Sequence, residues 1–235
     1  MSIIYINPYR FAAAGPTGPT DPDFANVSLL LHGDGTNGST TIVDSSSSSK
    51  TVTAFGNAQI STAQSKFGGS SIAFDGSDDY LTGPSNDADF NFGTGDFTIE
   101  AFAYPVEPRT GTIFCYRSNN SDGVIVIQNI GQWFAKVGYT SVAAGTVTVN
   151  SFSHIAAVRA SGVLTLYVNG TSVGSNSNAT DNITGSASHV VRIGALSETP
   201  SSLQWKGHID DLRITKGVAR YTANFTPPTA PFPDA

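Results

Sequence analysis

The last third of the chain carries the pattern that most restricts how this sequence can fold. Apolar and polar residues alternate through residues 163–168, and Asn169-Gly170 follows directly. Asn-Gly is a preferred pair for a two-residue turn between antiparallel strands, because this turn needs positive φ at both positions. Further strand-like runs follow at residues 190–194 and 208–214, with no helical period between them. The pattern predicts an all-β fold built from hairpins.

Strand-like segments also occur through the rest of the chain, separated by clusters of glycine, serine, asparagine and aspartate that are typical of turns. They fall at residues 27–32, 51–55, 71–74, 80–82, 97–104, 112–117, 123–127, 132–139, 146–149 and 152–160. About a dozen short strands of this kind suit a two-sheet antiparallel jelly-roll sandwich. The proline-rich tail at residues 225–233 cannot pair as a central strand, so we expect it to wrap the surface.

The first 26 residues differ in composition from the rest. Two Gly-Pro-Thr triplets occur within residues 15–20, which are too few for a collagen helix. Prolines at this density also remove the backbone donors that a strand needs. We therefore predict an extended N-terminal arm over residues 1–26, which docks onto a partner chain, and one jelly-roll domain over residues 27–235.

Composition excludes several classes of protein. The 235 residues include 12 Lys and Arg against 18 Asp and Glu, a net charge of −6. Because the basic residues are scattered in an acidic chain, we expect no nucleic acid partner. Cys115 is the only cysteine, so no internal disulfide can form. The sequence shows no signal peptide and no run of membrane-spanning length, and we expect a soluble protein without membrane insertion.

Two late segments connect the chain to a known family. Residues 164–170, Leu-Thr-Leu-Tyr-Val-Asn-Gly, and residues 207–214, Gly-His-Ile-Asp-Asp-Leu-Arg-Ile, resemble the later strands of laminin-G-like, concanavalin A-like jelly rolls. The resemblance extends over about residues 27–234. Residues 67–81 and 211–228 are similar to the form of this domain found in tailed-bacteriophage virion proteins. The resemblance implies a protein assembled in a bacterial cytoplasm and displayed on a virion surface.

The first functional hypothesis is accordingly a non-enzymatic bacteriophage structural protein, either a capsid decoration or a tail-associated component. Its arm would bind other virion proteins, and its jelly roll would bind host-surface glycans. Homo-oligomerisation would multiply weak sugar contacts through effective concentration. The alternative, from another class, is a stand-alone bacterial lectin or a glycan-degrading module.

The resemblance also implies a metal site. Jelly rolls of this kind often hold a structural Ca²⁺ between the loop after the first strand and the late Ile-Asp-Asp strand. These positions correspond to Asp34 and Asp210, with Asp211 as a substitute. Carboxylate oxygens on loops suit Ca²⁺, which takes about six to eight oxygen ligands. For the other aspartates, turn formation through the side chain is the preferred interpretation.

Aromatic and amide side chains indicate where a sugar could bind. Trp133 and Trp205 are candidate stacking faces, because aromatic rings with a polar edge can cover the apolar side of a sugar. Asn119 and Asp122, together with Asn120, lie in a loop that could bind hydroxyl groups. Both tryptophans also lie in strand-like contexts, so burial in the core is an equal alternative for each.

Glycoside hydrolysis is the enzymatic rival, because concanavalin-type jelly rolls include glucanases that carry paired acidic residues on one strand. Such catalysis needs two carboxyl groups roughly 5 to 9 Å apart, one of them with a raised pKa. The chain has only three glutamates, and Glu100 is the single acidic residue of its predicted strand. We therefore predict no catalytic residues.

Overall fold

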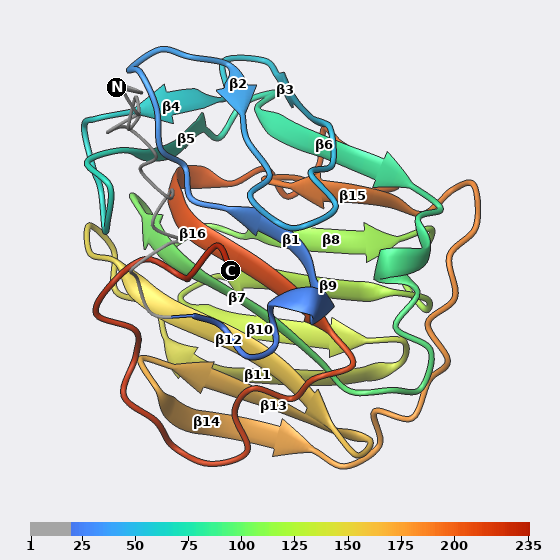
Figure 1. Cartoon of the computed structure of the whole chain (residues 1–235). Helices are drawn as coiled ribbons and strands as arrows, with labels where there is room; N and C mark the ends of the chain where they lie inside the picture. The colour runs from blue at the N-terminus through green and yellow to red at the C-terminus, as the bar shows by residue number, and fades with distance from the viewer. Residues whose placement is uncertain (1–19) are drawn as a thin grey trace, which may run out of the picture.

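The computed structural model describes residues 20–235. Backbone hydrogen bonds join its strands into two antiparallel sheets packed face to face (Figure 1). Within that range each sheet has eight strands. Sheet A contains β1 (Val27–Leu31), β4 (Gln59–Ser61), β5 (Ser71–Asp75), β7 (Phe97–Pro105), β12 (Ser153–Ala160), β13 (Val163–Val168), β14 (Thr171–Asn176) and β16 (Lys206–Lys216). Sheet B contains β2 (Thr41–Ile42), β3 (Val52–Phe55), β6 (Tyr80–Ser85), β8 (Gly111–Arg117), β9 (Val124–Asn129), β10 (Gln132–Val137), β11 (Thr140–Thr146) and β15 (Val190–Ile193).

The strand order identifies the sandwich as a jelly roll. Sheet A runs β14-β13-β12-β7-β16-β5-β4, with β1 also paired to β16, and sheet B runs β11-β10-β9-β8-β15-β6-β3-β2. Strands distant in sequence are therefore neighbours, such as β7 and β16, while hairpins join β8 to β11 in order. Two short 3-10 helices, η1 (Phe24–Asn26) and η2 (Ala88–Phe90), lie outside the sheets. The predicted all-β sandwich is confirmed, and no helix in residues 20–235 is long and apolar enough to span a membrane.

The Asn-Gly hairpin forms where the sequence predicts it. Asn169 and Gly170 have φ angles of 49° and 76° and connect β13 to β14. A Cβ atom on Gly170 would lie 1.9 Å from the carbonyl oxygen of Phe225, because the C-terminal segment packs against this turn. Glycine is thus required here both for the backbone conformation and for the close approach of the tail.

The C-terminal segment covers the face of sheet A that is turned away from sheet B (Figure 1). Tyr221 and Phe225 pack against Tyr167 of β13, and Phe232 packs against Phe102 of β7. Sheet A is therefore buried on both of its faces over much of its area, whereas the outer face of sheet B has only partial cover from loops. The outer face of sheet B is therefore the less covered of the two outer faces.

The folded body begins earlier than predicted. Asp21 lies within the predicted arm, yet its side chain is only 2% exposed and forms ion pairs with Arg213 and Arg220 at 3.0 and 2.7 Å. An aspartate that neutralises two buried guanidinium groups belongs to the domain, so the boundary at residue 26 is wrong for residues 21–26. Residues 1–19 of the predicted arm lie outside the described residues.

One predicted strand is also misplaced. The β-branched run at residues 146–149 does not form its own strand, because β11 spans Thr140–Thr146 and pairs with β10. Val147 instead packs into the core, and its amide donates to the carbonyl of Gly131 at 2.9 Å. The strand propensity of this β-branched run is here outweighed by the pairing of β10 with β11, whose turn lies at Gly138 and Tyr139.

Candidate functional site

The two tryptophans proposed as sugar-stacking faces lie in the core between the sheets. Trp133 and Trp205 are both 0% exposed, with ring centroids 6.4 Å apart. Side chains of a strand point alternately to opposite faces, and Trp133 lies on the inner face of β10. The prediction that they contact a sugar is therefore wrong, and the alternative of core packing is confirmed for both.

The loop at residues 118–122 is shaped by its own hydrogen bonds. One carboxylate oxygen of Asp122 accepts from the amides of Ser118 and Asn119, both at 2.9 Å. These bonds and the Ser118 hydroxyl lower the pKa of Asp122 although its partial burial acts in the opposite direction. Asn119 is exposed and binds Ser121. The side chains of Asp122 and Asn119 thus hold the loop in its conformation. Asn120 is the loop residue that contacts the sheet, because it accepts hydrogen bonds from Arg117 and Lys136.

A hollow of about 280 Å³ opens on the outer face of sheet B, which we call the sheet B hollow. Strands β8 to β11 supply its floor, and two loops and the β10–β11 hairpin supply its rim. Its lining combines aliphatic, aromatic, amide, hydroxyl and cationic side chains: Arg117, Asn120, Ile125, Ile127, Phe134, Lys136, Tyr139, Ser141 and Leu203.

Two aromatic side chains form the apolar part of the sheet B hollow. Phe134 follows Trp133 in β10 and so points outward, where it packs with Ile125, Ile127 and Leu203. Tyr139 stands at the tip of the β10–β11 hairpin and is 76% exposed. An exposed tyrosine and a half-buried phenylalanine in the same hollow offer ring surface for the C–H groups of a sugar.

Fixed polar groups border this aromatic surface. Arg117 donates to both carboxylate oxygens of Glu198, at 3.1 Å from Nε and 2.6 Å from Nη2. Its Nη1 donates to Oδ1 of Asn120 at 3.1 Å, and Lys136 donates to the carbonyl oxygen of Asn120. Bidentate pairing holds the guanidinium in one orientation, so these donors are ordered before any ligand arrives.

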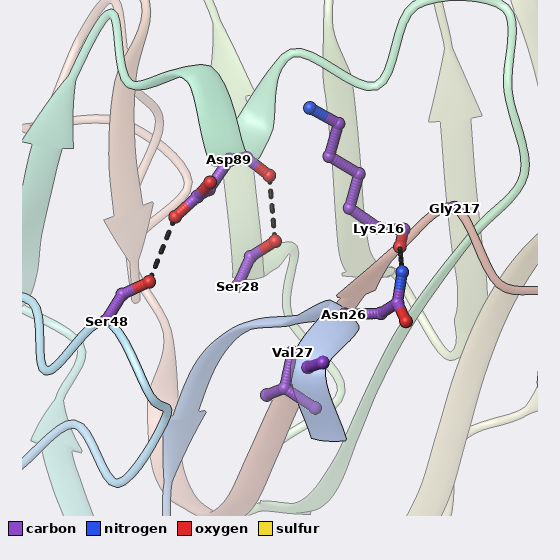
Figure 2. A pocket seen from close by; sticks show the side chains of 8 residues that line it. Asn26, Val27, Ser28, Ser48, Asp89, Lys216 and Gly217 are labelled. Carbon is purple, nitrogen blue, oxygen red and sulfur yellow. Dashed lines mark hydrogen bonds between the residues drawn. The ribbon is translucent and has the colours of Figure 1, made fainter. Parts of the chain in front are cut away.

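A second depression lies between the start of β1 and the end of β16, and its polar groups bind one another (Figure 2). Ser28 donates to the carbonyl oxygen of Asp89 at 2.8 Å, and Ser48 donates to the Asp89 carboxylate at 3.1 Å. Asn26 donates to the carbonyl oxygen of Lys216 at 3.3 Å. No aromatic side chain lines this depression in the described part of the chain, and its contacts connect β1 to η2.

The three aspartates proposed as metal ligands, Asp34, Asp210 and Asp211, differ in how their oxygens are engaged. Asp211 accepts from the Phe232 amide at 2.8 Å and lies 2.5 Å from Nδ1 of His32, whose Nε2 is 2.7 Å from Asp234. Its oxygens therefore tie the C-terminal segment to the body. Within residues 20–235, Asp34, Asp210 and Asp211 do not bring three ligand atoms together, whereas the turn aspartates Asp75, Asp78 and Asp79 do.

Asp210 differs from Asp211 in having an unpaired oxygen. Its Oδ2 accepts from the amides of Lys66 and Phe67 at 2.6 and 3.2 Å, but its buried Oδ1 has no partner. Burial, with the charges of Asp211 and Asp34, raises the pKa of Asp210 to about 7. Asp34 is exposed, and its carboxylate fills the space beside Gly68, where a Cβ atom would lie 1.8 Å from Oδ1.

Glu100 is a structural residue. Burial alone would raise its pKa, but the Arg213 charge and hydrogen bonds with His154 and Tyr221 lower that pKa to about 2. The side chain is 0% exposed. A carboxylate that is permanently ionised and sealed from solvent cannot serve as the general acid of a glycosidase.

The sequence matches the profile of one protein family over more than half of its length. The profile of the family described as "Concanavalin A-like lectin/glucanases superfamily", Laminin_G_3, matches residues 75–220. The chain belongs to this family. The expected resemblance to concanavalin A-like jelly rolls is thereby confirmed. No curated protein matches the sequence.

Solved structures share the fold at low sequence identity. The binding domain of Paraclostridial Mosquitocidal Protein 1 has a TM-score of 0.62 and 15% identity, over 83% of this chain and 50% of that one. Domain 4 of AbnA, a GH43 extracellular arabinanase from Geobacillus stearothermophilus solved in complex with arabinotriose, has a TM-score of 0.61 and 17% identity, over 82% and 93%. The binding domain of Botulinum neurotoxin DC, in complex with rat synaptotagmin II, has a TM-score of 0.60 and 14% identity, over 83% and 49%. The chain spans about half the length of the two toxin domains.

Proposed function

We propose that the chain is a non-catalytic glycan-binding jelly roll with the sheet B hollow as its binding site. The observation that carries this proposal is the meeting of Tyr139 and Phe134 with the ordered polar groups of Arg117 and Asn120 in one hollow. Sugars present apolar C–H faces and a belt of hydroxyl groups, and both need partners. The arabinanase domain of the same fold, solved with arabinotriose, supports the choice of ligand.

The carboxylates support the non-catalytic part of the proposal. Each of the three glutamates is engaged by a cation: Glu100 by Arg213, Glu107 by Lys206 and Glu198 by Arg117. Asp210 has the raised pKa that a general acid needs, but it is only 1% exposed and so cannot reach a substrate. A release assay for reducing sugars should therefore show no turnover on any glycan that the protein binds.

Binding can be tested on a glycan array with a matched pair of variants. Tyr139→Ala removes the exposed ring at one end of β10, and Ile130→Ala removes an equally exposed apolar side chain, also 76%, at the other end. The wild type and Ile130→Ala should bind the same glycans, and Tyr139→Ala should bind them about tenfold more weakly, which corresponds to about 1.4 kcal/mol. Equal binding by all three proteins, or no binding to any glycan, would contradict the proposal.

The setting that we propose for this module is the surface of a bacteriophage virion, with the N-terminal arm as its attachment to other virion proteins. The similarity of residues 67–81 and 211–228 to phage virion domains supports this setting. Display in several copies would compensate for the low affinity of a shallow site. Labelled antibody against the jelly roll should decorate intact particles, and deletion of residues 1–19 should abolish that signal; unlabelled particles favour the stand-alone lectin.

We also propose that Asp34 and Asp210 hold a structural Ca²⁺. The unpaired, buried Oδ1 of Asp210 fits such an ion, since a buried carboxylate oxygen needs a partner. Asp211 does not fit, because both of its oxygens are already engaged. Bound calcium would supply positive charge there and connect the loop after β1 to β16.

A further inference from the structure

We propose that the glycan bound in the sheet B hollow is acidic, and that Lys136 is the residue that contacts its negative group. This inference rests on the proposed function of the hollow and adds the class of sugar. Acidic here means a sugar unit with one carboxylate or one phosphodiester group. Three observations on charge carry it.

The strands of sheet B differ in charge from the chain as a whole. The eight strands contain no aspartate and no glutamate within the described residues, but they contain Arg117, Lys136 and Arg192. The whole chain has a net charge of −6. The strands of sheet B thus contribute cations and no carboxylate to its outer face, so any negative charge near it comes from the loops at its rim.

The carboxylates near the sheet B hollow are committed to other partners. Glu198 pairs with Arg117 through both oxygens. Asp122 accepts hydrogen bonds from its own loop, and Asp181 accepts from the Tyr139 amide at 3.2 Å. None of these three residues lines the hollow, so its lining carries two cations and no anion.

Of the two cations that line the sheet B hollow, Lys136 is the one without a carboxylate partner in the described part of the chain. Its Nζ donates to the carbonyl oxygen of Asn120 and lies 3.4 Å from Oδ1 of the same residue, and both acceptors are neutral. Among residues 20–235 no carboxylate oxygen lies within 4.0 Å of it, whereas Arg117 has Glu198. The ammonium of Lys136 already donates to neutral oxygens, but it lacks the Coulomb attraction of an opposite charge, which Arg117 has from Glu198. An anionic ligand would supply that charge, so it gains most at Lys136.

The geometry also limits how much charge the ligand can carry. One unpaired ammonium in the hollow matches one negative group beside Phe134 and Tyr139. A nucleic acid would bring a continuous row of phosphates to a protein of net negative charge, with few cations to receive them. A sugar unit with a single acidic group satisfies both the aromatic surface and the isolated cation.

The test uses acidic polymers beside neutral counterparts. The probes are polygalacturonate and its methyl ester, hyaluronate and its carboxyl-reduced form, and poly(glycerol phosphate) as the phosphodiester arm, each titrated by calorimetry at low and high salt. We expect the wild type to bind at least one acidic probe about tenfold or more tightly than its neutral counterpart, with the preference weakened by salt. Which acidic probe binds distinguishes the carboxylate from the phosphodiester.

Variants assign this preference to one residue. Lys136→Gln should lose the preference but still bind the neutral counterpart, and Lys136→Arg should keep it. Lys66→Gln makes the same change in net charge beside Phe102, on the outer face of sheet A, and should leave the preference unchanged. Equal affinity of the wild type for charged and neutral probes, or a preference retained by Lys136→Gln, overturns this inference alone. Failure to bind any glycan overturns the proposed function with it.

Discussion

Arg213 of β16 donates two hydrogen bonds to one carboxylate oxygen of Glu100 in β7, at 3.0 and 2.8 Å. The two side chains are only 6% and 0% exposed. They lie on the outer face of sheet A, beneath the C-terminal segment. Asp21, His154, Arg220 and Tyr221 belong to the same network. The pair thus connects two central strands to both ends of the folded body.

Breaking this ion pair should destabilise the protein strongly. Glu100→Gln leaves the Arg213 charge poorly compensated in a buried site, and loss of one partner of a buried pair costs about 3 to 5 kcal/mol. Glu107→Gln is the control, because its partner Lys206 is 39% exposed, and it should cost less than about 1 kcal/mol. Urea unfolding measures both values; similar, small losses for the two variants would show that the buried network adds little.

Acid should remove part of the stability through the same glutamate. The pKa of Glu100 is about 2 in the folded state, below its ordinary value of 4.5. A lowered folded-state pKa means that the stabilisation is complete above pH 4.5 and is lost as the pH falls towards 2. The free energy of unfolding should therefore decrease over this window, and the decrease should be smaller for Glu100→Gln than for Glu107→Gln. Parallel curves would place the acid sensitivity elsewhere.

The fluorescence of both tryptophans should not respond to glycan binding. Because Trp133 and Trp205 are 0% exposed and pack against each other, their emission maximum and their quenching by acrylamide should not change when a glycan saturates the protein. Trp133→Ala should lower the free energy of unfolding by about 3 to 5 kcal/mol through the cavity that it leaves. A shift in emission on binding would mean that a ligand reaches the inner faces of the sheets.

Calcium should raise the melting temperature if it occupies the proposed site. A ligand that binds only the folded state stabilises it, and for a domain of this size about 1 kcal/mol corresponds to roughly 2 to 4 °C. The rise should be absent in Asp210→Asn and present in Asp75→Asn, which alters the acidic turn before β6. The reverse result would place the ion in that turn, and no effect on the wild type would contradict a calcium site.

Local patterns predicted the fold well because they act over short distances. The Asn169-Gly170 turn, the strands on either side of it and the sandwich class all follow from turn chemistry and the two-residue period. Burial of Asp21 could not be predicted in this way, because its partners Arg213 and Arg220 are about two hundred residues away in sequence. Contacts of that range depend on the packing of the whole chain.

The candidate site was missed for a related reason. Alternation places Trp133 on one face of β10 and Phe134 and Lys136 on the other, but it does not say which face is the core. Choosing the tryptophan as the ligand contact therefore selected the wrong side of the strand. The high average burial of tryptophan, together with the charge of Lys136 on the opposite face, is the signal that would have assigned the faces correctly.

The central claim, that the sheet B hollow binds a glycan, is tested most directly by mapping amide chemical shifts of the labelled protein during titration with a glycan that it binds. We predict that the largest changes occur at Asn120, Phe134, Lys136 and Tyr139, with saturation at one common affinity. Changes centred on Asn26 and Lys216, or on the outer face of sheet A, would contradict the account.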